Sequence, residues 1–189
     1  MVKPVMYRIA AAVLLFVILV CSGFLQPAPI YQTVNSKISF KSEAPLELIK
    51  ASSDQLIGLL DNDKKVFSFK INIRSFQGFN SPLQKEHFNE NYLESDKYPE
   101  ASFKGKIIED TDLSKDGTYE VRAKGILTIH GVTQERIIKS NVVVNNKKII
   151  VTSNFSVLLS DHNIPIPIVV YKKLANEIKV EVVATLEPR

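Results

Sequence analysis

Apolar and polar side chains alternate strictly in Val66-Phe67-Ser68-Phe69-Lys70-Ile71-Asn72-Ile73. Successive side chains of a β-strand point to opposite faces, so Phe67, Phe69, Ile71 and Ile73 would share one face. A strand with one apolar and one polar face is typical of antiparallel sheets that bury one side and expose the other to water. This stretch therefore predicts a half-buried β-strand.

The same two-residue period continues through most of the chain after residue 30. Residues 119–129 and 177–186 alternate over more than one average strand length, and turn-forming sequences separate the alternating runs. Many short alternating runs of this kind predict an all-β domain, either a barrel or a sandwich. Further predicted strand runs lie at 38–40, 55–60, 101–107, 140–144 and 149–155, and turns are predicted at 61–64, 115–117, 130–131 and 145–146.

Two stretches depart from this period. Residues 81–93 begin with Ser81 and Pro82, a capping residue followed by one that suits the first helical turn. We predict one short helix there, packed over an end of the sheet. Residues 163–170 contain two prolines, which disfavour the helical conformation in the residue before each of them. We predict that this segment is extended and lies at an edge or rim, outside the central strands.

Composition limits the class of protein. The chain has 189 residues, of which 45% are hydrophobic and 23% are charged, and its formal net charge is +4. This length favours one domain, and this apolar content excludes a disordered chain. The single cysteine, Cys21, excludes a disulfide framework and any multi-cysteine metal site.

The first residues have the features of a secretory signal peptide. Lys3 and Arg8 precede an unbroken apolar run over residues 9–20, and small residues follow it. The run is shorter than the roughly 20 residues that a membrane-spanning helix needs. We therefore predict a cleaved signal peptide over residues 1–23 and a periplasmic or secreted protein, in preference to an uncleaved membrane anchor.

Cys21 raises the alternative of a lipoprotein, because bacterial lipid attachment uses a cysteine directly after a short apolar core. Val20 stands where the processing peptidase prefers a small residue, so anchoring through a lipidated Cys21 is the less favoured alternative. Without Lys3 and Arg8 the net charge would fall to +2. A nearly neutral domain gives no electrostatic argument for nucleic-acid binding, so no nucleic-acid partner is expected.

The inward faces of the predicted strands mix large and very small side chains. A solid core is filled to close packing, whereas small inward residues leave room either for a neighbouring side chain or for a ligand. A barrel filled by its own side chains and a barrel that holds one apolar ligand both fit this pattern, and a glycine in a strand can also mark a bend. The large inward residues are Phe67, Phe69, Phe103, Tyr119 and Phe155, and the small ones are Ala101, Gly105, Ala123, Gly125 and Ala184.

The sequence offers weaker signals for catalysis or for a metal. The chain after the predicted leader has no thiol, and none of its histidines forms a His-Glu-x-x-His pair. Acidic and histidine residues between 86 and 96 favour a solvated helix face over a cation site. Ser160-Asp161-His162 contains three triad residue types, but contiguous side chains rarely converge on one another. We predict a turn there, which makes a hydrolase the least favoured hypothesis.

Two motifs of the chain resemble those of the YceI-like family. The first is Asn89-Glu90-Asn91-Tyr92-Leu93-Glu94-Ser95-Asp96-Lys97-Tyr98-Pro99-Glu100-Ala101-Ser102-Phe103-Lys104-Gly105. The second is Leu127-Thr128-Ile129-His130-Gly131-Val132-Thr133, a strand that runs into a His-Gly turn. The motifs occur in the order found in that family, whose domain would span residues 30–187.

The resemblance implies an antiparallel, lipocalin-like β-barrel with one short helix, which encloses a long isoprenoid or other lipid chain. It implies no enzymatic activity, no metal and no cofactor, and it assigns His130 the role of holding its turn by hydrogen bonding. The chain departs from the family pattern in its early strand, where Asn35-Ser36 stands in place of a His-Ser pair, and at Asn80-Ser81-Pro82 before the helix. These departures leave the identity of the lipid open.

The expected partner is thus an isoprenoid or fatty-acyl lipid in an apolar tunnel, and a homodimer is left open. The alternative is a filled barrel without a ligand, acting as an envelope stress or partner-binding module. The helix residues expected over the barrel end are Phe88, Tyr92 and Leu93. The expected tunnel lining consists of Phe40, Phe67, Phe69, Ile71, Ala101, Phe103, Gly105, Val121, Ala123, Gly125, Leu127, Phe155, Val180 and Val182.

Overall fold

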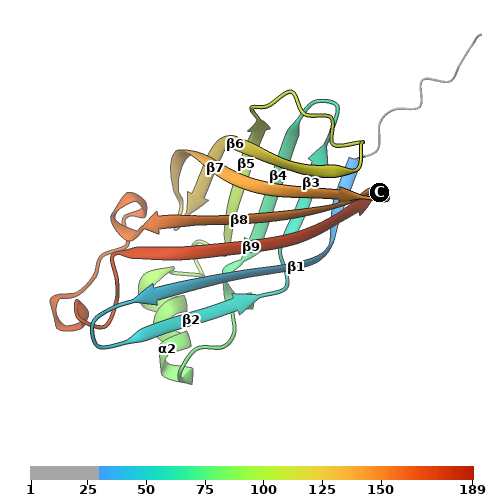
Figure 1. The fold of residues 1–189 in the computed structure, drawn as a ribbon. Helices are drawn as coiled ribbons and strands as arrows, with labels where there is room; N and C mark the ends of the chain where they lie inside the picture. Colours follow the sequence, from blue (N-terminus) through green and yellow to red (C-terminus); the bar gives the residue numbers. More distant parts are fainter. Residues whose placement is uncertain (1–29) are drawn as a thin grey trace, which may run out of the picture.

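The computed structural model describes residues 30–189, so the predicted signal peptide and Cys21 lie outside the described residues. Nine antiparallel strands form one sheet in the order β2-β1-β3-β4-β5-β6-β7-β8-β9. Strand β1 also pairs with β9, and this pairing closes the sheet into the predicted all-β barrel (Figure 1). The strands are β1 (Ile30–Glu43), β2 (Leu48–Ser53), β3 (Ile57–Asp61), β4 (Val66–Asn72), β5 (Glu100–Ile107), β6 (Gly117–Ile129), β7 (Val132–Asn145), β8 (Lys148–Leu158) and β9 (Glu177–Pro188).

Strands β2 and β3 share one place in the barrel wall, because both pair with the same edge of β1. The nine strands therefore occupy eight wall positions. The interruption between β2 and β3 is bridged by the buried Ser36, whose Oγ lies 2.9 Å from the carbonyl oxygen of Asp54 and accepts a hydrogen bond from the Leu56 backbone N–H at 3.2 Å. Ser36 thus satisfies backbone groups that the broken ladder leaves without strand partners.

Strand β2 is the one strand within residues 30–189 that the periodicity of the sequence did not predict. Its inward positions include Ala51 and Ser53, both of which are buried. Small inward side chains give a weak hydrophobic alternation, so the two-residue period is hard to recognise in this strand. Pairing with β1 decides its conformation.

The predicted short helix is present. Helix α2 (Pro82–His87) begins after Ser81, whose Oγ accepts a hydrogen bond from the Gln84 N–H at 3.1 Å, and it continues as the π-helical turn η2 (Phe88–Tyr92). Figure 1 shows α2 beside β2, at the end of the barrel where β1 turns into β2. None of the helices within residues 30–189 is long and apolar enough to span a membrane.

The segment between β8 and β9 lies outside the strands, as predicted, but it is not extended throughout. The 3₁₀ turns η3 (Leu159–His162) and η4 (Ile168–Val170) lie within it, and Asn163 has a φ of 54°. A proline restricts its own φ and the residue before it but not the residues after it, so the chain after Pro167 is free to turn. The Val170 N–H accordingly donates to the Pro167 carbonyl at 3.0 Å.

The two ends of the barrel differ. At the end formed by loops 62–65, 108–116 and 146–147, which we call the closed end, apolar side chains fill the interior. At the other end, which we call the mouth end, lie the β1–β2 turn, residues 73–99 with α2, the β6–β7 turn and residues 159–176. Short helical segments cover part of the mouth end, and the first of them along the chain is the 3₁₀ turn η1 (Ile73–Ser75). The side chains that fill the closed end include Tyr31, Leu113, Val142, Val144, Ile149 and Leu186.

Candidate functional site

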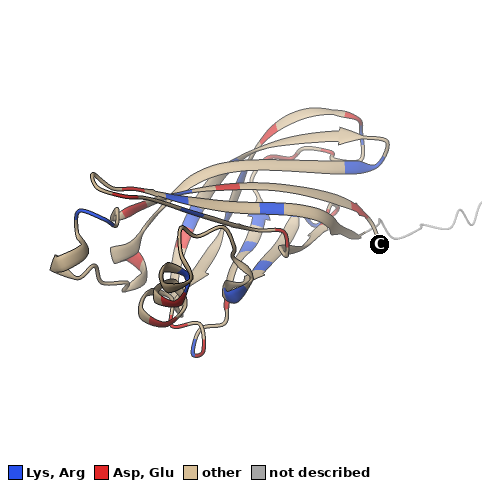
Figure 2. Cartoon of the chain, turned by 90° about the horizontal axis from the view of Figure 1, so that it is seen from below, with Lys and Arg blue, Asp and Glu red and all other residues tan. Residues whose placement is uncertain are grey.

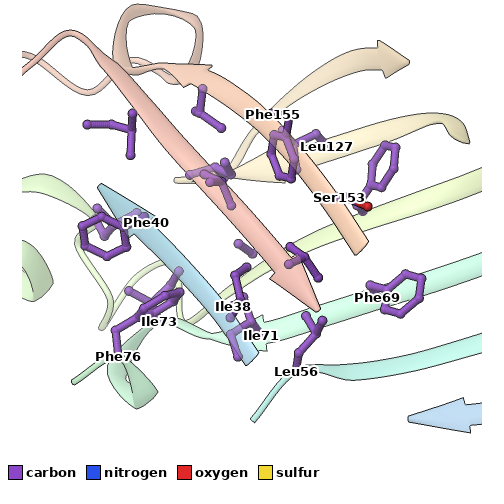
Figure 3. A pocket seen from close by; sticks show the side chains of 18 of the residues that line it. Ile38, Phe40, Leu56, Phe69, Ile71, Ile73, Phe76, Leu127, Ser153 and Phe155 are labelled. Carbon is purple, nitrogen blue, oxygen red and sulfur yellow. The ribbon is translucent and has the colours of Figure 1, made fainter. Parts of the chain in front are cut away.

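A cavity of about 540 Å³ occupies the barrel interior between the closed end and the mouth end. Its wall follows β9 from Ile178 through Val180 and Val182 to Ala184, six residue steps that correspond to a length of roughly 20 Å. Figure 3 shows side chains from several strands converging on this space. The filled-barrel hypothesis requires an interior that side chains fill, and this cavity contradicts it.

Nearly all of the residues predicted to form the tunnel lining do line this cavity, and so do the three helix residues predicted over the barrel end. Their contact with a ligand stays a prediction. The predicted residues that line the cavity are Phe40, Phe67, Phe69, Ile71, Ala101, Phe103, Val121, Ala123, Leu127, Phe155, Val180 and Val182, together with Phe88, Tyr92 and Leu93.

Gly105 and Gly125 are the exceptions, and their predicted place in the lining is wrong. The two glycines face each other across β5 and β6, in direct register. A Cβ on Gly125 would lie 2.3 Å from the carbonyl oxygen of Lys104, and a Cβ on Gly105 would lie 2.1 Å from that of Lys124. Here the missing side chains allow two backbones to approach closely and leave no space for a ligand.

An aromatic cluster at the mouth end was not predicted as part of the site. Phe76 and Phe79, in the segment before α2, pack around Phe40 and Phe88. The Phe40 and Phe88 rings stack with their centroids 5.3 Å apart, and the Phe79 and Phe88 rings are 5.0 Å apart. All four rings line the cavity. Because Phe76 and Phe79 lie outside any alternating run, the two-residue period does not predict which way their side chains point.

Most of the polar atoms of the cavity wall already have partners. The hydroxyls of Ser140 and Ser153 lie 2.7 Å apart and hydrogen-bond to each other across β7 and β8. Ser42 Oγ accepts a hydrogen bond from the Ala175 N–H at 2.9 Å, and Lys70 pairs with Glu100 at 2.8 Å. A wall whose polar groups are satisfied by the protein offers an apolar surface to a guest.

Charged and polar side chains gather instead where the cavity reaches the mouth end. Glu47, Gln84, His87 and Lys173 line it there, and Glu47 Oε1 accepts a hydrogen bond from Gln84 Nε2 at 2.8 Å. The interior is thus apolar along its length and polar at its opening. This arrangement suits an elongated molecule with a hydrocarbon body and one polar end.

His130 joins the two family-type motifs in space. Its Nδ1 lies 3.1 Å from the carbonyl oxygen of His162, and its Nε2 lies 2.6 Å from Glu94 Oε2. Each ring nitrogen thus lies within hydrogen-bonding distance of an oxygen atom, one from the segment before β5 and one from the segment after β8. The Tyr98 ring packs edge-on against His130, with centroids 4.7 Å apart. His130 thus fastens the β6–β7 turn to both segments that cover the mouth end.

Ser160, Asp161 and His162 lie in the turn η3, as predicted, and do not form a catalytic triad. The buried His162 ring points its Nδ1 at the Val132 carbonyl, 3.2 Å away, and Asp161 pairs with Arg136 at 3.6 Å. Burial lowers the pKa of His162, since it disfavours the charged ring. Among residues 30–189 no three histidine, cysteine or acidic side chains are placed to hold a metal ion together.

Comparison with known protein families agrees with the barrel fold. The family model described as the YceI-like domain matches residues 31–186. The chain belongs to the YceI-like family. No curated protein matches it at a significant level.

Solved structures share this YceI-like fold. A polyisoprenoid-binding domain from Saccharophagus degradans, implicated in plant cell wall breakdown, superposes with a TM-score of 0.70 at 16% identity, over 86% of this chain and 100% of that one. The BcnA protein of Burkholderia cenocepacia has a TM-score of 0.66 at 16% identity, over 79% of this chain and 95% of that one. At these identities the likeness shows the fold alone.

Proposed function

We propose that this YceI-like protein is a carrier that holds one long-chain isoprenoid or other lipid inside its barrel. The observation that carries the proposal is the cavity of about 540 Å³, whose wall is apolar over roughly 20 Å of strand length. Burying a methylene group contributes about 0.8 kcal/mol, so a long chain supplies binding energy without any polar motif. The polyisoprenoid-binding activity in the description of the Saccharophagus degradans domain supports the same class of ligand.

The lipid enters with its chain toward the closed end and keeps its polar head at the mouth. At the closed end the side chains of Leu113 and Ile149 are almost fully buried. Glu47, Gln84 and Lys173 at the mouth offer hydrogen-bonding and charged partners to a head group. An amphiphile in the opposite orientation would place its polar head against apolar walls whose polar groups already have partners. Burying a polar head without a new hydrogen bond is costly.

We further propose that the protein binds and releases this lipid without chemical reaction, in the periplasm or outside the cell. The features of a signal peptide in residues 1–23 support export, and Cys21 is the sole cysteine of the chain. His162, the one buried histidine among the described residues, is engaged with a backbone carbonyl. A carrier needs an apolar cavity and an accessible mouth, and it needs no catalytic group.

Solvent extraction of the purified protein followed by mass spectrometry tests the proposal, together with uptake of a fluorescent prenyl or acyl probe. Ala123→Phe places a ring in the cavity and should lower probe uptake at least tenfold. Glu120→Phe, on the exposed face of the same strand, is the matched control and should bind as the parent does. A protein that yields no lipid and takes up no probe would instead favour the partner-binding module.

A further inference from the structure

Exposed apolar side chains lie on three segments at the mouth end, namely the β1–β2 turn, α2 and the η4 segment. We call this set the mouth rim and define it as Leu46, Leu83, Ile168, Val169 and Tyr171. Ile168 is 85% exposed and Val169 is 88% exposed, the highest values among the large hydrophobic side chains of residues 30–189. Two aliphatic side chains so fully in water are costly, and adjacent exposed apolar residues commonly mark an interaction surface.

The mouth rim is held in this form by the surrounding fold. In η4 the Val170 N–H donates to the Pro167 carbonyl at 3.0 Å, and the Lys173 N–H donates to the Val170 carbonyl at 2.7 Å. The Leu46 N–H donates to the Lys172 carbonyl at 2.9 Å, which joins the β1–β2 turn to the η4 segment. Ile164, which precedes η4 in the same loop, is buried in an apolar cluster with Leu93 and Leu159 and anchors the segment to the barrel. The outward direction of Ile168 and Val169 is therefore built into the fold.

Exposed apolar residues elsewhere in the described chain are arranged differently. Ile126 and Ile137 stand on the outer faces of β6 and β7, where Ile126 lies opposite Glu135 and Ile137 lies opposite Lys124. Scattered apolar residues of that kind are ordinary on protein surfaces. The mouth rim differs because it adjoins the cavity opening, where Leu83 is both a rim residue and a lining residue.

Charge accompanies the apolar tip. Residues 163–176 carry Lys172 and Lys173 and no acidic side chain. In Figure 2 the loop that holds this segment projects at the left, with basic positions next to its uncharged tip. Acidic side chains lie elsewhere at the mouth end, with Glu47 at the opening and the exposed Glu86 and Glu90 on α2 and η2, so the basic character belongs to residues 163–176. Aliphatic residues at a tip, an adjacent tyrosine and lysines directly behind them form the pattern of a segment that enters a membrane interface.

We propose that the mouth rim docks on a lipid bilayer with anionic head groups, so that the cavity opens toward the membrane. This inference rests on the proposed carrier function, because a docked mouth would let a hydrocarbon chain pass between bilayer and cavity without crossing water. The lysines complement negatively charged head groups. A protein partner fits less well, because stable interfaces use roughly 20–30 residues on each side, and the rim is a small projection at an opening.

Vesicle flotation of the full exported protein tests the docking. Vesicles of phosphatidylethanolamine with phosphatidylglycerol should bind the protein more tightly than vesicles of phosphatidylcholine. The double variant Ile168→Ser with Val169→Ser should weaken binding to both kinds at least tenfold. Lys172→Gln should weaken binding to the anionic vesicles about fivefold and leave binding to phosphatidylcholine unchanged. Ile137→Ser, an exposed isoleucine on the barrel wall, is the matched control and should bind as the parent does.

Uptake of a soluble fluorescent prenyl probe, measured without vesicles, separates this inference from the carrier function. Ile168 and Val169 do not line the cavity, so the double variant should take up the probe as the parent does. A parent protein that takes up the probe but does not bind vesicles would overturn the docking surface and leave the carrier function standing. Loss of vesicle binding in Ile137→Ser as well, or a parent that uses the rim to dimerise and ignores vesicles, would also overturn the docking surface.

Discussion

The two ends of the barrel use similar side chains for opposite purposes. At the closed end Leu113, Ile149 and Leu186 have almost no contact with water, whereas at the mouth end Leu83 and Ile168 are largely exposed. Apolar burial supplies most of the stability of a folded domain. The comparison indicates that stability is concentrated at the closed end and that the mouth end keeps apolar surface available for binding.

At the mouth end hydrogen bonds supplement a smaller buried apolar cluster, which includes Leu93, Leu159 and Ile164. Backbone and side-chain contacts such as Ala175 N–H to Ser42 Oγ, at 2.9 Å, and the link from His130 to Glu94, at 2.6 Å, hold the covering segments against the barrel. Polar contacts of this kind fix direction without filling the interior. An end fastened in this way can retain its shape while a cavity persists beneath it.

The largest effect should come from a truncation at the closed end. Ile149→Ala removes a fully buried side chain that cannot be replaced by water, and we expect it to lower the free energy of unfolding by about 3 kcal/mol. Leu83→Ala at the mouth should change it by less than about 0.5 kcal/mol, because that side chain is exposed. Urea unfolding followed by circular dichroism measures both. Equal losses in the two variants would break the comparison between the ends.

A smaller effect is expected where the barrel wall changes from close backbone contact to cavity lining. Gly125→Ala places a methyl group against Lys104 and should cost about 2 kcal/mol of unfolding free energy, since the strands have to separate. Ala123→Val, the previous inward position of the same strand, extends into the cavity and should cost less than about 0.5 kcal/mol. Thermal unfolding of the pair tests this contrast. A Gly125→Ala variant as stable as the parent would indicate that a side chain at position 125 has room toward the cavity.

The smallest expected effect is a pH dependence that belongs to the mouth end. Burial lowers the pKa of His162 below its ordinary value of 6.5, so the unfolded chain takes up a proton at a higher pH than the native protein does. The free energy of unfolding should therefore fall as the pH drops below about 6.5. Nearby Asp161 opposes this shift of the pKa and Arg136 reinforces it, but burial is the larger influence.

His162→Asn removes the titrating ring and should flatten this pH dependence between about pH 7 and pH 5. Urea unfolding at a series of pH values provides the measurement. The exposed carboxyl of Glu43, whose pKa is held at about 2 by Lys179 and Lys41, loses its favourable contribution only at lower pH and so does not obscure the result. A parent and variant with the same pH dependence would show that folding does not shift the pKa of His162.

Much of the fold follows from local pattern. The alternation in residues 66–73 predicts β4 and the inward direction of Phe67 and Ile71, and Ser81 with Pro82 predicts the start of α2. The sequence could not distinguish two kinds of small inward residue. Ala123 borders the cavity and Gly125 lies against the neighbouring backbone, although both stand on the same face of β6. The distance between adjacent strands makes the difference, and it depends on residues far away in sequence.

The sequence by itself determined an all-β domain, the faces of its main strands and its short capped helix, because two-residue alternation and helix capping act between near neighbours. Its motifs also indicated the family that the match over residues 31–186 shows. Only the tertiary structure decided that the barrel closes through β1 and β9, that its interior keeps a cavity and that the three segments of the mouth rim lie at the same end. These features arise where segments distant in sequence meet, and no local pattern encodes the space left between them.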